Sequence, residues 1–508
     1  MSQTIKKFHW KYLFLIIVLF NLFVCSWYVL NSDIYYHSVI ARDFLILREI
    51  GEKKIVLIGA RTGASGIYHG VFWYYLMFPA YLISGGNPVA VGWFWVILIA
   101  LFLFAGLRMA KGLFGETVAY LYTILVSGYL MFEANSLTHP AGTVFLAPFF
   151  VFFFYKYITS LNPKYLAVVV ILAGLLIHLE LVMGVPFLIL SFAYVFVLQF
   201  KRKKFHHLLM FFLIVIPLAT YIVFELRHNF FQLRNMIGYI MEGRHLSVNF
   251  LSVIWGRINY ISMSGIPLVK NLTLNRIILA VFACSFLVLF RKQKRNKDFY
   301  LISLYFFAGF FIISLISPYF LLSHHFIAFI PVAFLLLISV MFVGWGRLLI
   351  PLFVFAVLFN EIQGILFIRN SYGIIGRSDT SWKFYNNMSR QIFNNNKGDF
   401  GYFVFSPDTF AYQGKYAMYY QSRKYSKTVS LYSTKMPTTY LVMAPPPSGD
   451  SEIELTGPFW KNNTLQIKKE ADEATRYENG YLVEKLSLTD DETKVQFNKN
   501  YDPGLSFR

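Results

Sequence analysis

The first 370 residues contain few side chains suited to acid–base chemistry, and the positions of those few are informative. Only 11 of the 26 acidic residues lie there, and just two of these, Glu116 and Asp298, fall in loops that we predict to be cytoplasmic. Ionisable groups near a bilayer are costly, so the other nine are candidates for function. They are Asp33, Asp43, Glu49, Glu52, Glu133, Glu180, Glu225, Glu242 and Glu361. Any chemistry of this chain should therefore face the outer side of a membrane.

Asp43 lies in the stretch HSVIARDFLILREI, residues 37–50, which is typical of an amphipathic surface helix. One interpretation is structural, because the carboxylate could complement the helix dipole or pair with Arg42 or Arg48. The other is catalytic, because partial burial at the mouth of a membrane cavity can tune a carboxylate for proton abstraction. Both interpretations stay open.

A glycine-rich stretch follows, GARTGASGIYHG, which contains four glycines together with Arg61 and His69. It lacks the Gly-Lys-Ser/Thr ending of a Walker A loop and does not contain GxGxxG after a strand, which argues against nucleotide binding. A glycine-rich turn can instead let backbone amides approach a phosphate or a sugar. By itself the pattern is not specific.

Two short polar stretches interrupt apolar segments further along the chain. FEANSLTHP carries Glu133 and His139, which either cap the helix that starts there or take part in function. IHLEL carries His178 and Glu180 inside an apolar hairpin, where they either satisfy each other by hydrogen bonding or serve a site.

The predicted outer loop after residue 225 is basic and aromatic, against the usual excess of Lys and Arg on the cytoplasmic side. Its arginines could hold a lipid phosphate bidentately, or pair with outer carboxylates and ordinary headgroups. Two later histidines are adjacent and do not face one way on a helix, so they make no metal site by themselves, although one could meet an anionic headgroup. The residues concerned are Arg227, Arg234, Arg244, Arg257, His324 and His325.

The composition shows which kind of scaffold must position these side chains. The 508 residues are 57% hydrophobic and only 14% charged, which is typical of a polytopic membrane protein. The net charge of +20 is explained by clusters such as KRKK (201–204) and RKQKRNK (291–297), which flank apolar runs of spanning length. We therefore expect membrane lipids, and no nucleic acid, as partners.

Placing the basic clusters in the cytoplasm predicts eleven membrane helices in the plasma membrane, with the N-terminus inside and the C-terminus outside. The apolar stretch 68–84 must then lie outside as an interfacial or re-entrant helix, because its roughly 17 residues are at the lower limit for spanning. The predicted spans are 12–30, 89–107, 117–134, 140–157, 165–179, 182–199, 208–225, 272–290, 299–317, 326–344 and 348–367.

The composition changes after Phe367. Residues 371–508 hold 15 of the 26 acidic residues and combine strand-like runs with turns such as APPPSGD. The predicted fold class is thus mainly α, a polytopic helical membrane domain at 1–370 with its first outer loop at 31–88, followed by a small extracytoplasmic α/β domain at 371–508.

Several motifs together resemble a known family. These are an acidic residue in a large first outer loop, GxxGIYHGxxWYYLxxP followed by GGNPVAV, the basic helix end GLRMAKGLFG and an outer C-terminal domain. They look like the GT-C class of integral-membrane glycosyltransferases, and are similar to its bacterial members related to protein O-mannosyltransferases and lipid A aminoarabinose transferases. The resemblance covers residues 1 to about 345 in organisation and is most specific between 41 and 115.

This resemblance implies transfer of a hexosyl or pentosyl group from a polyprenyl-phosphate donor to an acceptor hydroxyl outside the cytoplasm, on a protein, a lipid or a cell-envelope glycan. An acidic residue of the first outer loop would be the general base, and Asp43 matches that position best. Asp33 is the alternative, because many relatives carry an Asp-Glu pair after the first helix where this chain has SDIY.

Basic residues on outer loops of the family hold the donor phosphate, and Arg227, Arg234, Arg244, His324 and His325 occupy comparable places by topology. The full predicted substrate-binding set also includes Arg42, Arg61, His69, Glu133, His139, His178 and Glu180. The reaction needs no ATP, because the phosphate is already a good leaving group. The chemistry also accommodates a divalent metal ion, although the sequence shows no clear ligand cluster for one and we predict no metal ligands.

Two other classes of function compete with transfer. A carrier or flippase for lipid-linked sugars would have charges near the middle of the membrane and inverted repeats, whereas these spans are nearly free of central charges. A receptor-like sensor that binds a ligand with its outer tail would leave the acids of the first loop without a purpose.

Overall fold

The computed structural model describes residues 2–133, 137–242, 249–292, 296–316, 323–396, 398–408, 410–425, 434–447 and 456–498. The chain forms two compact units. The helical unit contains Met1–Trp27, Ile55–Leu76 and Trp93–Arg369. The α/β unit contains Tyr28–Lys54, Met77–Gly92 and Asn370–Arg508.

Helices coincide with all eleven predicted spans. Seven of the helices among the described residues are long and apolar enough to cross a membrane. Of four shorter apolar segments, three lie at predicted spans and the fourth is Phe72–Ile83; the remaining predicted span, 117–134, is the helix Glu116–Glu133. The helices at the predicted spans are α1 (Ser2–Cys25), α5 (Pro88–Phe114), α6 (Glu116–Glu133), α7 (His139–Ser160), α8 (Pro163–Leu179), α9 (Leu181–Arg202), η1 with α10 (Phe205–Ile214, Val215–Arg227), α13 (Leu272–Leu289), α14 (Lys297–Ile316), η5 with α15 (Ser323–Phe329, Ile330–Val340) and α16 (Ile350–Ser371). The prediction of a mainly helical, multi-pass membrane protein is confirmed.

Helix α4 (Phe72–Ile83) lies in the apolar stretch 68–84, which the sequence predicts to be an interfacial or re-entrant helix rather than a membrane span. Its 12 residues extend about 18 Å at about 1.5 Å per residue, well short of a hydrocarbon core of about 30 Å. A straight helix of this length does not cross a bilayer, which agrees with the interfacial or re-entrant helix that the sequence predicted.

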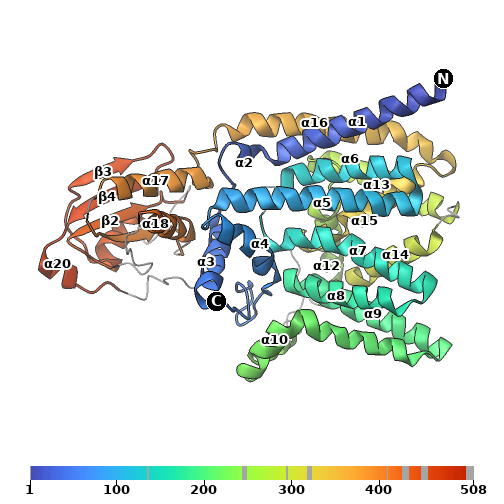
Figure 1. The fold of residues 1–508 in the computed structure, drawn as a ribbon, viewed down its shortest axis with the longest axis horizontal. Coiled ribbons are helices and arrows are strands. Elements are labelled where there is room, and N and C mark those ends of the chain that lie inside the picture. The colour runs from blue at the N-terminus through green and yellow to red at the C-terminus, as the bar shows by residue number, and fades with distance from the viewer. Residues whose placement is uncertain are drawn as a thin grey trace. The chain divides into compact units, whose positions relative to one another are not determined.

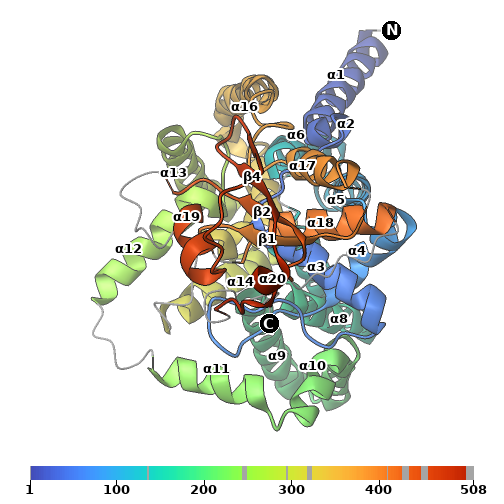
Figure 2. The ribbon, with the colours of Figure 1, turned by 90° about the vertical axis from the view of Figure 1, so that its left-hand side faces the viewer.

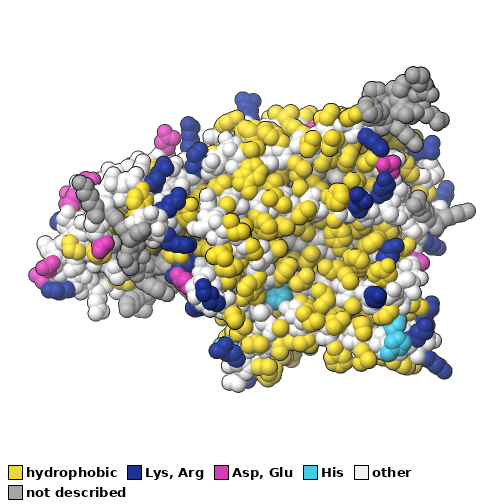
Figure 3. Space-filling view, in the orientation of Figure 1, with side chains coloured by type: hydrophobic (Ala, Val, Ile, Leu, Met, Phe, Trp, Pro, Cys, Tyr) yellow, Lys and Arg dark blue, Asp and Glu magenta, His cyan; other side chains and the backbone are white. Residues whose placement is uncertain are grey.

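Hydrophobic side chains cover the visible face of the helical unit, with Lys and Arg at its margins (Figure 3). On α5, Ile97, Leu101 and Phe104 are exposed and follow the spacing of one helix face, whereas Trp95 and Ile99 are buried. A helix that is apolar on its outward side as well as its inward side is suited to a lipid environment rather than to water.

Helices α7, α8 and α9 run side by side (Figure 1). Phe150 and Phe154 of α7 lie with ring centroids 5.1 Å from that of Phe306 on α14, and Phe187 of α9 lies 5.0 Å from Phe150. These edge-on and tilted contacts between buried rings fix the helices relative to one another. The start of α7 and the turn between α8 and α9 are thereby held at the same end of the bundle.

The α/β unit contains a four-stranded sheet in the order β1-β2-β4-β3 (Figure 2). The strands are β1 (Gly401–Phe405), β2 (Thr438–Met443), β3 (Glu473–Arg476) and β4 (Leu482–Ser487). Strands β1 and β2 pair in parallel, with Phe403 opposite Leu441, and the other pairs are antiparallel. The predicted α/β fold of this region is confirmed.

The two faces of the sheet bury different partners. Phe403 and Leu441 pack with Trp460 of η8 (Trp460–Thr464), which follows α19 (Gly457–Phe459). On the opposite side of the alternating strands, Val404 lies against Gly414 of α18 (Tyr412–Lys424), which packs on α17 (Trp382–Asn394). Helices therefore cover both faces.

Segments from the N-terminal third of the chain complete this unit. Helix α3 (Ser38–Lys53) packs on α18, and the ring of Phe44 lies 5.2 Å from that of Tyr416. Just before α3, the buried Tyr36 contacts the rings of Trp382 and Tyr385. The C-terminal segment thus shares its core with residues that the sequence places in the first outer loop.

Candidate functional site

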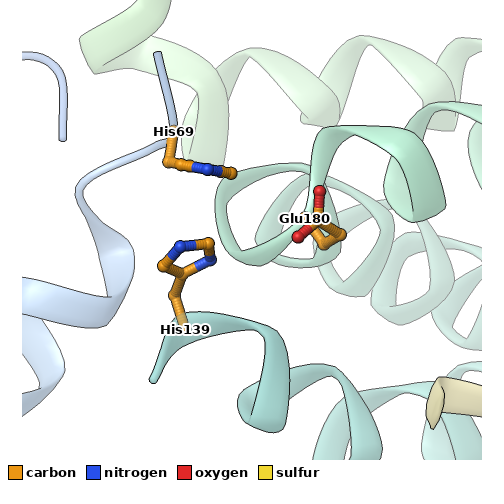
Figure 4. A group of neighbouring side chains, drawn as sticks. All are labelled: His69, His139 and Glu180. Atoms are coloured by element: carbon orange, nitrogen blue, oxygen red, sulfur yellow. The ribbon is translucent and has the colours of Figure 1, made fainter. Parts of the chain in front are cut away.

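Three predicted substrate-binding residues meet in the helical unit: His69, His139 and Glu180. A ring nitrogen of each histidine and a carboxylate oxygen of Glu180 all lie within 4.8 Å of one another. Figure 4 shows the three side chains, which come from a loop, the start of α7 and the α8–α9 turn. A fourth predicted residue, His325, places its Nε2 atom 3.6 Å from Oε1 of Glu180. We call these four residues the His/Glu cluster.

The glycine-rich loop positions His69 through its backbone. The His69 carbonyl accepts from Gly59 N at 2.8 Å, and His69 N donates to the carbonyl of Ala60 at 2.9 Å. Gly70 N then donates to the carbonyl of His178 at 3.1 Å, which fastens the loop to the end of α8. A Cβ on Gly59 would lie 2.7 Å from the Gly70 carbonyl oxygen, and one on Gly70 would lie 2.0 Å from His178 Nδ1. These two glycines are needed for close backbone packing around the cluster.

His139 is the first residue of α7 and is only 5% exposed. Its Nδ1 lies 2.7 Å from the carbonyl oxygen of Leu179, an acceptor that requires the ring nitrogen to donate. In the neutral imidazole Nε2 is then the unprotonated nitrogen, because only one ring nitrogen carries a proton. The ring centroid of His139 lies 4.0 Å from that of His69.

Glu180 is the single extended residue between α8 and α9, with φ −155° and ψ 105°. Its carbonyl accepts from the backbone N–H groups of Met183 and Gly184, and its own N–H donates to Leu176. A Cβ on Gly184 would lie 2.2 Å from the backbone nitrogen of Ile177, so the turn is as tight as glycine allows. The Glu180 side chain is nearly buried, at 4% exposed, among imidazoles. A buried carboxylate is costly unless positive charge or hydrogen-bond donors compensate for it.

The other predicted residues of the helical unit have different surroundings. His178 is buried and its Nε2 lies 2.6 Å from the Pro217 carbonyl, which ties α8 to α10. Arg61, Arg227 and Arg234 are exposed, and Glu133 is half-buried. Arg244 and the side chain of His324 lie outside the described residues.

Asp33 and Asp43, the two candidates for a catalytic base, both belong to the α/β unit. Asp33 is fully buried and accepts hydrogen bonds from the backbone N–H groups of Ile34, Gly376 and Lys383 and from the hydroxyl of Ser381. Burial raises the pKa of Asp33, and these four hydrogen bonds oppose the rise. Its carboxylate ties the segment after α2 (Trp27–Leu30) to the start of α17.

Asp43 has a different setting on α3. It is 4% exposed, and its Oδ1 accepts from Nε and Nη2 of Arg42 at 3.2 and 3.1 Å. The Arg42 guanidinium compensates the charge of the buried carboxylate. Pairing with Arg42 is the structural interpretation that the sequence left open. It is compatible with the catalytic interpretation, in which Asp43 is a base.

The sequence pointed to each member of the His/Glu cluster but not to the cluster itself. Its members stand at positions 69, 139, 180 and 325, so no spacing rule joins them. The available signal was the predicted topology, which put all four on the outer side. Their meeting depends on the packing of α7, α8 and α9, which a single sequence does not reveal.

The chain matches no protein-family model and no curated protein. Its fold is nevertheless that of two solved structures of ArnT from Cupriavidus metallidurans. One, bound to undecaprenyl phosphate, aligns with a TM-score of 0.60 at 12% identity over 96% of this chain and 99% of that chain. The other, in the apo state, aligns with a TM-score of 0.58 at 12% identity over 97% and 100%. The expected GT-C-like fold is confirmed over nearly the whole chain.

Proposed function

We propose that the protein is a GT-C glycosyltransferase that moves a monosaccharide from a polyprenyl-phosphate donor to an acceptor hydroxyl on the extracytoplasmic face of the plasma membrane. The observation that carries this proposal is the shared fold over 96% of the chain with an ArnT structure that was solved with undecaprenyl phosphate. A hexosyl or pentosyl donor and a protein, lipid or cell-envelope glycan acceptor both fit this reaction.

Asp43 is the general base of the proposed reaction. Its nearly buried carboxylate accepts two hydrogen bonds from the Arg42 guanidinium on a regular helix, so the direction of the carboxylate is fixed. Asp33 suits the role less well, because four donors already occupy its two oxygens. Removing a proton from the acceptor requires a free lone pair on the base.

Cations of the helical unit bind the departing phosphate. Exposed arginines can hold a phosphate through two parallel hydrogen bonds, and we assign this role to Arg61, Arg227 and Arg234, together with Arg244 and His324. The leaving group already carries negative charge, so these cations lower the barrier without ATP.

The orientation in the membrane follows from charge. With the basic clusters inside, the His/Glu cluster and residues 371–508 lie on the extracytoplasmic side and the N-terminus in the cytoplasm. The burial of Asp33 among residues of the C-terminal segment supports placing the first outer loop and that segment on the same side.

Incubation of the purified protein with a panel of polyprenyl-phosphate sugars and membrane acceptors tests the proposal. An enzyme releases polyprenyl phosphate and forms a glycosylated product with at least one donor of the panel. A carrier or flippase moves the intact donor across a vesicle bilayer without breaking its glycosidic bond, and that result would replace the transferase proposal.

A further inference from the structure

We propose that His69, His139 and Glu180 bind a divalent transition-metal cation of the zinc class. This site goes beyond the proposed transfer reaction, because it requires neither a sugar donor nor Asp43. Three considerations support it: the types of ligand atom, their geometry and the groups that hold them.

The ligand atoms are of the right kind. Two imidazole nitrogens with one carboxylate oxygen are a common protein ligand set for zinc and for neighbouring divalent metals, whereas Mg²⁺ and Ca²⁺ prefer oxygen alone. Thiolate is absent from the cluster, since Cys25 is a buried residue of α1 and Cys284 an exposed residue of α13. The ligand set is therefore two histidines and one glutamate, and it differs from the cysteine-containing sets of four protein ligands in structural zinc sites.

The geometry needs little adjustment. Ligands about 2.1 Å from a tetrahedral zinc ion lie roughly 3.4 Å apart. The three ligand atoms lie within 4.8 Å of one another, so each has to move by less than about 1 Å. His69 sits on a loop and Glu180 has several rotatable bonds, so side-chain rotation supplies this movement (Figure 4).

Outer contacts already orient the ligands. The hydrogen bond from His139 Nδ1 to the Leu179 carbonyl leaves Nε2 as the ligand atom, which is the usual second contact of a metal-bound histidine. The backbone of His69 is fixed by three hydrogen bonds, two with Gly59 and Ala60 and one from the next residue. On the carboxylate side, His325 Nε2 lies 3.6 Å from Glu180 Oε1.

A plain buried hydrogen-bond network among the same residues is the competing explanation. Such a network either balances the carboxylate with an imidazolium or carries a proton on Glu180 that is donated to an imidazole. The rings of His69 and His139 are 4.0 Å apart, and a third imidazole, His325, is close. A divalent cation balances the charge while both histidines remain neutral. The two explanations differ in whether the protein takes up metal at all.

Three protein ligands leave at least one coordination position of the metal ion open, as in catalytic zinc sites. That position would take a water or an anionic oxygen, and in the proposed reaction this is an oxygen of the donor phosphate. This assignment, unlike metal binding itself, rests on the proposed function.

The direct test is zinc titration of the full-length protein in detergent, purified with a tag that lacks histidine and stripped with a chelator. We expect about one tightly bound zinc ion per chain, counted by elemental analysis, and weaker uptake of Mn²⁺. His69→Ala, His139→Ala and Glu180→Gln should each weaken zinc binding by more than the roughly 10- to 100-fold that loss of an outer contact costs.

His206→Ala is the matched control, because His206 is an exposed histidine in η1. It should bind zinc as the wild type does. A wild type that takes up no stoichiometric zinc, or cluster variants with unchanged affinity, would overturn the proposal. Glu180→Gln is a nearly isosteric substitution, and its Tm without zinc shows whether the variant folds as the wild type does. Added zinc should raise the Tm of the wild type and should not raise that of the variant.

A second experiment, which measures binding of the donor lipid with and without zinc, distinguishes failure of the metal site from failure of the proposed transfer reaction. Undecaprenyl phosphate should bind more tightly to the zinc-loaded than to the stripped wild type, and equally to both forms of Glu180→Gln. Zinc uptake without sugar transfer from any donor would contradict the enzyme and leave the metal site standing. Transfer by a protein that binds no zinc would contradict the metal site alone.

Discussion

Two buried carboxylates, Asp33 in the α/β unit and Glu180 in the helical unit, have different kinds of partner. Asp33 accepts three backbone N–H bonds and one hydroxyl bond, whereas Glu180 lies among imidazole side chains. Backbone donors do not move away from an acceptor without a change of fold, so Asp33 holds the unit together. Imidazoles can rotate and bind another ligand, so Glu180 can serve a site. Burial alone therefore does not separate a structural carboxylate from a functional one.

Asp33→Ala should have the largest effect on stability of the variants discussed. It leaves the backbone N–H of Lys383 and the hydroxyl of Ser381 without the Asp33 acceptor, and leaves Gly376 N with Ser381 Oγ alone; each lost partner costs about 1 to 3 kcal/mol. We expect destabilisation of about 3 kcal/mol or more, seen as a lower Tm of the full chain in detergent. Glu180→Gln, measured alongside without zinc, should lower the Tm much less. Equal losses from the two variants would remove the distinction between the two carboxylates.

Gly70→Ala tests whether close packing of the loop positions His69. The added Cβ would lie 2.0 Å from His178 Nδ1 and 2.6 Å from its Cα, and overpacking of this kind costs about 1 to 3 kcal/mol. We expect a lower Tm together with weaker zinc binding. Gly63→Ala is the control, because a Cβ on Gly63 meets nothing within 4 Å. If Gly63→Ala has the same effect as Gly70→Ala, backbone packing is not what positions the histidine.

The smallest expected effect concerns the start of α3, which carries Asp43. His37 caps this helix by accepting from Val39 N at 3.2 Å, and burial, with a smaller contribution from Arg42, lowers the pKa of His37. Because the folded state favours the neutral ring, the stabilisation is complete above pH 6.5 or so and is lost as the pH falls through the folded-state pKa.

His37→Asn keeps a capping acceptor without a titrating ring. The wild type should therefore lose more stability than His37→Asn between pH 7.5 and pH 5.5, by about 0.5 to 1 kcal/mol. Thermal unfolding at both pH values measures this difference. Identical pH dependence in the two proteins would show that the His37 cap does not contribute.

The sequence predicted the helices and the C-terminal sheet because their signals are local. Apolar runs of spanning length and the rise in acidic residues after Phe367 are visible without any knowledge of tertiary contacts. The sequence also predicts a helix in the apolar stretch 68–84, and α4 lies within it. These predictions rest on a periodicity or a composition that a window of about 20 residues contains.

Long-range contacts were not accessible in the same way. Nothing in SDIY indicates that Asp33 accepts bonds from residues more than 340 positions later, and nothing in GARTGASGIYHG indicates that Gly70 packs on His178. The sequence predicts that the glycine-rich turn can approach a phosphate or a sugar; the structure adds that Gly59 and Gly70 make room for close backbone packing around His69. Such contacts depend on how whole helices pack, and the local patterns of a single sequence do not reveal that packing.

The central claim, enzymatic transfer with Asp43 as the base, is tested most directly by comparing wild type, Asp43→Asn and Glu52→Gln in a transfer assay with a polyprenyl-phosphate sugar. Glu52 is a half-exposed carboxylate on the same helix, paired with Arg48, and serves as the matched control. Loss of a general base should slow transfer by about 10²- to 10⁴-fold while donor binding stays close to wild type. The Tm should fall by no more than the loss of the Arg42 ion pair explains. Undiminished transfer by Asp43→Asn, or an equal loss in Glu52→Gln, would contradict the assignment.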